Sequence, residues 1–88
     1  NDVEYFVQIA SFKNKINANN LINKIKTSGI ASYLEKINTT NGTFFRVKTK
    51  NYENRNTANK ILVSIIEGHP SLRPIVKSLR KTDTVITK

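Results

Sequence analysis

The 88-residue chain lacks cysteine, methionine and tryptophan, and it has only three glycines and two prolines. Without cysteine, neither a disulfide framework nor a thiolate metal site is possible. The single histidine, His69, precedes Pro70 with no ligand partners nearby, so we expect a turn residue and no metal or other cofactor. No apolar run approaches the ~20 residues of a membrane-spanning helix, and we expect no membrane contact from this segment. The chain begins with Asn, and we expect it to be part of a longer protein that carries any anchor or catalytic domain elsewhere.

Acidic residues are also scarce: six Asp and Glu stand against fifteen Lys and Arg, which gives a net charge of +9. This excess favours a polyanionic partner, such as nucleic acid, an acidic membrane surface or an anionic cell-wall polymer. The basic residues are scattered rather than clustered, however, and the abundance of Asn, Ile and Lys is also typical of a compositional bias. The sequence has no paired carboxylates on one element, no Ser/His/Asp set and no Gly-rich phosphate loop. We therefore expect no catalytic residues and no enzymatic activity.

Residues 5–12 have the pattern of a half-buried strand, and the rest of a small sheet can assemble on it. Val7 and Ile9 alternate with Phe6, Gln8 and Ala10, which is the period of a strand with one buried face. Gln8 should therefore lie on the face opposite Val7 and Ile9. There it either solvates a bare sheet face or donates hydrogen bonds to a ligand.

Two stretches have helical spacing of apolar residues. The first runs from about Lys15 to Ser28, with Asn14 as N-cap and Gly29 as its end. The second runs from about Arg55 to Glu67, with Asn54 as N-cap. Their apolar stripes consist of Ala18, Leu21, Ile22 and Ile25 in the first helix and Ala58, Ile61, Leu62 and Ile65 in the second.

Between the helices lie two predicted strands, 31–37 and 43–49, joined at Asn41-Gly42. Both residues of this pair accept positive φ, so we expect a two-residue type I′ hairpin loop. In that register Thr40 pairs with Thr43, and Ile37 pairs with Arg46. Residues opposite each other share a face. This places Leu34, Lys36, Phe45 and Val47 on one face and Tyr33, Glu35, Ile37, Phe44, Arg46 and Lys48 on the other.

A fourth strand is predicted at residues 75–79, and Val85-Ile86 could add a little edge pairing. The resulting order, β-α-β-β-α-β, predicts an α+β ferredoxin-like domain over residues 4–80 with a polar tail at 81–88. Its four-stranded antiparallel-type sheet should carry both helices on one face, with the first and third strands in the middle. The other face would be open for binding, and it would hold Phe6, Gln8, Tyr33, Ile37, Phe44, Arg46 and Lys48.

Aromatic rings beside amide and guanidinium groups suit flat ligands with both apolar and polar surfaces. Nucleobases stack on aromatic side chains in four-stranded sheets of this topology. Pyranose rings can place their C–H faces on an aromatic ring while their hydroxyls reach Gln or Arg. From these residue types alone, both ligands fit.

The stretch Phe6-Val7-Gln8-Ile9-Ala10-Ser11-Phe12, followed by Asn17-Ala18 and Gly29-Ile30, resembles the first half of a SPOR domain (sporulation-related repeat). Phe44-Phe45-Arg46-Val47-Lys48, followed by Tyr52, Arg55 and Ala58, resembles its second half. The resemblance covers about residues 4–79. Lys50-Asn51 stands where the family usually has Gly-Pro.

This resemblance implies a bacterial module that binds septal peptidoglycan, in particular glycan strands stripped of their stem peptides. It also implies a location in the periplasm or on the wall side of the cytoplasmic membrane, at the division septum, and we expect a monomer. Gln8 and Ser11 occupy positions where the family's ligand contacts fall. The expected glycan site has Gln8, Ser11, Phe44 and Arg46 at its centre, with Phe6, Tyr33, Ile37 and Lys48 around them.

Two other functions stay open. An RNA- or single-stranded-DNA-binding sheet usually has a Gly-aromatic-Gly/Ala-aromatic pattern in its third strand. The chain has Phe44-Phe45-Arg46-Val47 instead, in which adjacent aromatic residues point to opposite faces, so we expect no nucleic acid partner. The third possibility is a ferredoxin-like domain that serves protein interaction through an edge strand.

Overall fold

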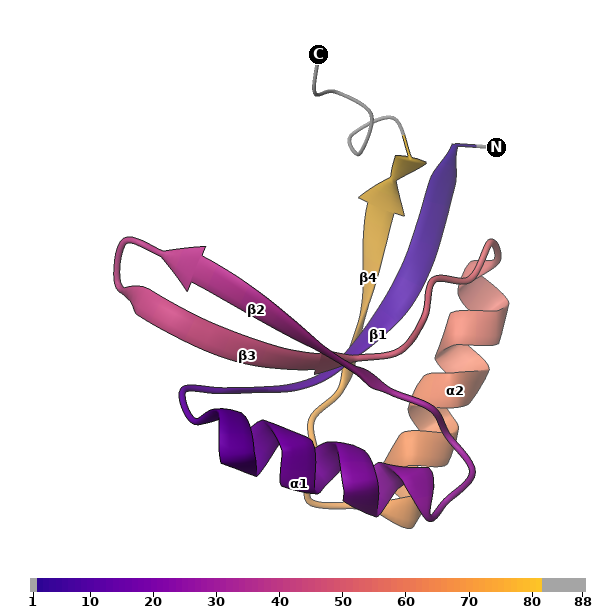
Figure 1. The fold of residues 1–88 in the computed structure, drawn as a ribbon. Helices are drawn as coiled ribbons and strands as arrows, with labels where there is room; N and C mark the ends of the chain where they lie inside the picture. The colour runs from indigo at the N-terminus through magenta and orange to yellow at the C-terminus, as the bar shows by residue number, and fades with distance from the viewer. Residues whose placement is uncertain (1, 82–88) are drawn as a thin grey trace.

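The structure is a computed structural model that describes residues 2–81. Its elements follow the predicted order (Figure 1): β1 Val3–Phe12, α1 Lys15–Lys26, β2 Tyr33–Thr39, β3 Gly42–Lys48, α2 Arg55–Gly68 and β4 Ile75–Arg80. The predicted polar tail, residues 81–88, lies outside the described residues apart from Lys81, and so does the edge pairing expected of Val85-Ile86.

The four strands form one sheet in the order β2-β3-β1-β4, and every neighbouring pair is antiparallel. The two central strands are β1 and β3, as the sequence predicts. Figure 1 shows α1 and α2 on the same side of the twisted sheet. No helix or strand within residues 2–81 covers the other side, so the sheet has one packed face and one open face.

The hydrophobic core lies between the sheet and the two helices. Three core residues come from the central strands: Val7, Ile9 and Val47. The others come from the predicted helical stripes: Ala18, Leu21, Ile25, Ala58 and Ile65. Full burial of a Val, Leu or Ile side chain contributes about 1.5–3 kcal/mol, so the helix-covered face is the main source of stability and the open face contributes less.

Both helices begin at the predicted N-caps. The Asn14 side-chain oxygen accepts hydrogen bonds from the backbone N–H groups of Ile16 (2.8 Å) and Asn17 (3.3 Å). The Asn54 side-chain oxygen accepts one from Asn56 (2.7 Å). Gly29 has a φ of 82° just beyond the end of α1, a conformation that glycine adopts without steric cost.

The predicted hairpin register is wrong by two residues. Thr39 pairs with Gly42 and Ile37 pairs with Phe44, so the loop is Thr40-Asn41. Asn41 does not have positive φ, which rules out the type I′ turn. Instead the Thr39 hydroxyl stabilises the turn: it donates to the Gly42 carbonyl (2.8 Å) and accepts from the Asn41 N–H (3.0 Å). A shift of two residues preserves the strand alternation, so the predicted face of each hairpin residue is correct.

The chain continues along β1 after β3 ends. The buried Thr49 hydroxyl accepts a hydrogen bond from Val7 N–H (3.0 Å) and donates one to the Lys50 carbonyl (2.9 Å). Further on, Tyr52 and Tyr5 exchange two backbone hydrogen bonds of 2.6 and 2.8 Å. These bonds hold residues 49–52 beside the sheet.

None of the helices within residues 2–81 has the length and apolar character needed to cross a bilayer.

Candidate functional site

Gln8 and Ser11 share the open face because of a β-bulge in β1. Gln8 pairs with Lys48, but Ala10 already pairs with Val47 and Ser11 with Arg46, so β1 contains one extra residue between Gln8 and Ala10. Beyond the bulge, the alternation of β1 is displaced by one residue. Ala10, which strict alternation would place on the open face, therefore packs against the core, and Ser11 lies beside Arg46.

Arg46 is at the centre of the open face and contacts two neighbouring strands. Its Nε and Nη2 atoms donate to Glu35 Oε1 of β2 at 3.0 and 2.7 Å. Its Nη1 atom donates to Gln8 Oε1 of β1 at 3.1 Å. A guanidinium has five N–H donors, so two of them have no acceptor within residues 2–81 and can donate to a ligand. The adjacent Lys48 ammonium lies 3.8 Å from the same Glu35 oxygen.

Phe6 lies beneath these two cations. The Lys48 Nζ atom is 4.2 Å and the Arg46 guanidinium carbon 5.2 Å from the centre of its ring, which is within cation–π distance. Phe6 is on the predicted face, but it is only 5% exposed. Its ring therefore supports the cations from below and offers little surface on which a ligand could stack.

The charges of Arg46, Lys48 and Glu35 sum to +1. Partial burial tends to raise the pKa of Glu35, but the Arg46 hydrogen bond and the charges of Lys48 and Arg46 outweigh this, so its pKa is lowered from 4.5. Glu35 is thus ionised at neutral pH. We call Arg46, Lys48, Glu35 and Gln8 the anion centre, because they present a net positive charge with hydrogen-bond donors that are not used within residues 2–81.

The remaining predicted site residues lie on either side of the anion centre. Phe44 and Ile37 are directly opposite each other and both half-buried. The Lys13 ammonium is 5.9 Å from the centre of the Phe44 ring. Tyr33, opposite Lys48, lies at the other end of the hairpin and is 52% exposed. The structure therefore brings the predicted residues onto one face, but they form a central cluster with two flanks.

Sequence reasoning missed the contribution of β4 to this face. Ile75 pairs with Gln8 and Lys77 with Phe6, so both lie on the open side of the sheet. Ile75 is 48% exposed, which provides an apolar surface next to the Gln8 amide. The alternation in residues 75–79 was too short to assign a face, and only the register with β1 determines it.

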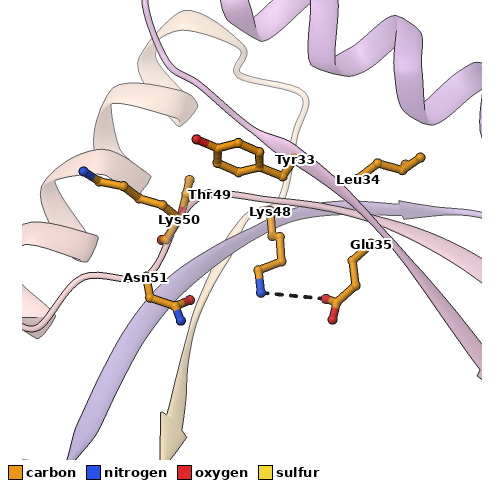
Figure 2. A pocket seen from close by; sticks show the side chains of 7 residues that line it. All are labelled: Tyr33, Leu34, Glu35, Lys48, Thr49, Lys50 and Asn51. Carbon is orange, nitrogen blue, oxygen red and sulfur yellow. Dashed lines mark hydrogen bonds and ion pairs between the residues drawn. The ribbon is translucent and has the colours of Figure 1, made fainter. Parts of the chain in front are cut away.

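A shallow depression of about 410 Å³ adjoins the anion centre, at the start of β2 and the end of β3. Figure 2 shows the side chains that line it: Tyr33, Leu34, Glu35, Lys48, Thr49, Lys50 and Asn51. Two of these residues, Glu35 and Lys48, also belong to the anion centre. Within residues 2–81 no group of three or more His, Asp or Glu side chains is arranged to hold a metal ion. The face as a whole suits an anionic ligand that also has apolar surface.

Comparison with known proteins identifies the family. Residues 1–69 match the family model of the SPOR domain. The chain belongs to the SPOR domain family. This confirms the resemblance seen in the sequence motifs, and the match includes β1, the hairpin and the whole of α2.

A solved structure has a similar fold. The solution structure of the peptidoglycan-binding domain of the B. subtilis cell wall lytic enzyme CwlC superposes with a TM-score of 0.72. The superposition covers 90% of this chain and 92% of that domain, at 22% sequence identity. At this identity the likeness concerns the fold. No curated protein sequence matches the chain.

Proposed function

We propose that this SPOR domain binds peptidoglycan through the open face of its sheet. Membership of the SPOR family supports this, and so does the structural similarity to a domain described as peptidoglycan-binding. The observation that carries the proposal is the anion centre. It places Arg46 and Lys48 over Phe6, in the middle of an uncovered sheet face with Gln8 and Ser11 alongside.

The preferred ligand is a glycan strand that has lost its stem peptides. Removal of a peptide leaves the lactyl carboxylate of muramic acid ionised, so a denuded strand is a regular polyanion. Arg46 can donate its two unused N–H groups to such a carboxylate, and Lys48 can add a point charge. The net charge of +9 would assist capture from a distance.

The burial of Phe6 favours a sugar over nucleobases. A single-strand nucleic acid site of this topology presents open aromatic rings on its central strands. Here the ring that β1 places on the open face, Phe6, is covered by two cations. The ring that β3 places there, Phe44, is half-buried. Hydrogen-bonding groups of Gln8, Ser11 and Arg46 dominate the middle of the face, which is better suited to hydroxyl and carboxylate groups than to stacked bases.

In this proposal residues 4–80 act as a monomeric, non-catalytic module that directs a larger protein to division septa, on the wall side of the cytoplasmic membrane. Two measurements address these points. The purified domain should release no muropeptides from isolated cell-wall sacculi. An exported fluorescent fusion should concentrate at septa, and an even distribution around the cell would contradict the septal role.

The central test is the double substitution Gln8→Ala with Arg46→Ala, measured by co-sedimentation with sacculi before and after amidase treatment. Hydrogen bonds to charged groups contribute ~1.5–3 kcal/mol each, so binding to amidase-treated sacculi should fall about tenfold or more. The loss should be largest at low salt, where the ionic part is least screened.

The matched control is Asn59→Ala with Lys60→Ala. This pair also removes one amide and one cation, but from exposed positions on α2, which packs on the covered face. It should bind like the wild type. If the Gln8/Arg46 variant stays folded and co-sediments as well as the wild type, the open face is not the binding site.

A further inference from the structure

The depression lies at the end of the hairpin away from its turn, where the chain leaves the sheet after β3. Strand β2 begins at Tyr33 opposite Lys48, the last residue of β3, and residues 49–51 then leave along β1. Thr49 fixes this exit, because its hydroxyl is hydrogen-bonded to Val7 N–H and to the Lys50 carbonyl. Hydrogen bonds of Thr49 to the backbone therefore fix one wall of the depression.

The lining of this depression is mainly apolar, with polar groups at one side. Tyr33 supplies a half-exposed aromatic ring, whereas the Leu34 side chain lies on the opposite face of β2 and packs against the core. Figure 2 shows the Tyr33 ring lying across the depression towards Thr49 and Lys50, while Lys48 and Asn51 point to another side. The Asn51 Nδ2 atom donates to Glu4 Oε1 at 3.2 Å. The side-chain carbonyl oxygen of Asn51, Oδ1, accepts no hydrogen bond within residues 2–81 and so can accept one from a ligand.

The depression is continuous with the anion centre. Lys48 and Glu35 line it, and Glu35 in turn accepts two hydrogen bonds from Arg46. A polymer whose carboxylate lies at Arg46 and Lys48 would therefore extend directly into the depression. Glu35, Lys48 and Lys50 give the lining a net charge of +1, but Lys48 is shared with Glu35 and the Lys50 Nζ atom lies 5.6 Å from the centre of the Tyr52 ring. In a denuded strand only every second sugar carries a carboxylate, so the sugar next to the one held at Arg46 is uncharged.

We propose that this depression is a second sugar subsite, which accepts the uncharged N-acetylhexosamine that neighbours the carboxylate-bearing sugar in a glycan strand. The C–H face of the pyranose, or its acetamido methyl group, packs on the Tyr33 ring. A hydroxyl or acetamido N–H donates to the Asn51 carbonyl oxygen. This inference rests on the proposed function, and it explains how a strand of alternating neutral and anionic sugars could be held in register.

The test uses a purified denuded tetrasaccharide of two repeats and follows backbone amide signals by NMR titration. The expected result is a set of shifts at Gln8, Ser11 and Arg46, together with shifts at Tyr33 and at residues 49–51. Aromatic contacts contribute about 0.5–1.5 kcal/mol, so Tyr33→Ala should weaken tetrasaccharide binding about two- to tenfold. Tyr33→Phe keeps the ring and should remain within about twofold of the wild type.

The outcomes separate the two proposals. Shifts confined to Gln8, Ser11 and Arg46, or wild-type affinity of a folded Tyr33→Ala variant, would overturn the second subsite and leave peptidoglycan binding intact. Absence of tetrasaccharide binding by the wild-type chain would overturn both. Because Tyr33 is half-exposed, its substitution should not unfold the domain, and the wild-type shift map tests the subsite without any variant.

Discussion

Replacement of Glu35 by Gln should change stability and ligand binding in opposite directions. Glu35 Oε1 accepts hydrogen bonds from Arg46 at 2.7 and 3.0 Å and lies 3.8 Å from the Lys48 ammonium. The substitution keeps the size of the side chain and removes its charge. The net charge of the anion centre then rises from +1 to +2, and both cations lose their intramolecular counterion.

The loss of stability should be modest, because the Glu35 side chain is 43% exposed and solvent screens its ion pairs. Exposed pairs contribute about 0.2–1 kcal/mol, which for a domain of this size corresponds to a fall in Tm of about 1–8 °C. Binding of denuded glycan should instead become about 1.4- to fivefold tighter, because the ligand carboxylate no longer competes with Glu35. The gain should diminish as salt is added.

The pH dependence gives an independent check. The pKa of Glu35 in the folded domain is below its ordinary value of 4.5, because the Arg46 hydrogen bond and the two cations outweigh the effect of burial. A lowered folded-state pKa contributes stability that is fully present above the unfolded-state value. This stability is lost as the pH falls through the folded-state value. The difference between wild type and Glu35→Gln should thus be constant near pH 7 and should disappear at strongly acidic pH.

Urea unfolding across this pH range measures the stability difference, and calorimetry with the denuded tetrasaccharide measures binding at pH 7. A stability difference that stays unchanged from pH 7 to acidic pH would refute the assignment of the effect to the Glu35 charge. Weaker glycan binding by a folded Glu35→Gln variant would show that Glu35 holds Arg46 in its binding position instead of competing with the ligand.

Two further substitutions test the supports of the site. Thr49→Val leaves the buried Val7 N–H without its acceptor and should lower the free energy of unfolding in urea by about 1–3 kcal/mol. The control, Thr57→Val at an exposed position of α2, should leave that free energy nearly unchanged. Equal effects of the two substitutions would contradict the structural role of the Thr49 hydroxyl. Phe6→Leu removes the ring beneath Arg46 and Lys48, and it should lower both stability, by about 1–2 kcal/mol, and glycan affinity, about severalfold. Glycan binding at the wild-type level by Phe6→Leu would show that the ring does not position the cations.

The hairpin illustrates how far local patterns reach. Asn41-Gly42 correctly indicated a turn between two strands, but the loop formed one residue earlier, at Thr40-Asn41. The Thr39 hydroxyl decided this, because it bonds to both Asn41 and Gly42, and dipeptide preferences do not include such a contact. The face of each residue was nevertheless predicted correctly, since a register error of two residues does not change the alternation.

In β1 the alternation between the two faces of the sheet is correct as far as Gln8 and fails beyond the bulge. Strict alternation would place Ser11 on the core face with Val7, and Ser11 was assigned to the site only through the family resemblance. The extra residue between Gln8 and Ala10 is visible only in the pairing with β3. A bulge depends on how two strands match, so the sequence of one strand does not reveal it.

The sequence by itself therefore determined the order of elements, the two helix starts and the packed face of the sheet, because helical spacing, strand alternation and capping are properties of neighbouring residues. The resemblance of its motifs to the SPOR domain indicated the family, which the family model confirms. Only the tertiary structure decided the character of the open face. It buried Phe6 under Arg46 and Lys48, set Glu35 against both cations, added Ile75 from β4 and formed the depression beside Tyr33. Each of these features joins residues from different strands, and their contacts follow from sheet register and burial, which emerge only when the whole chain has packed.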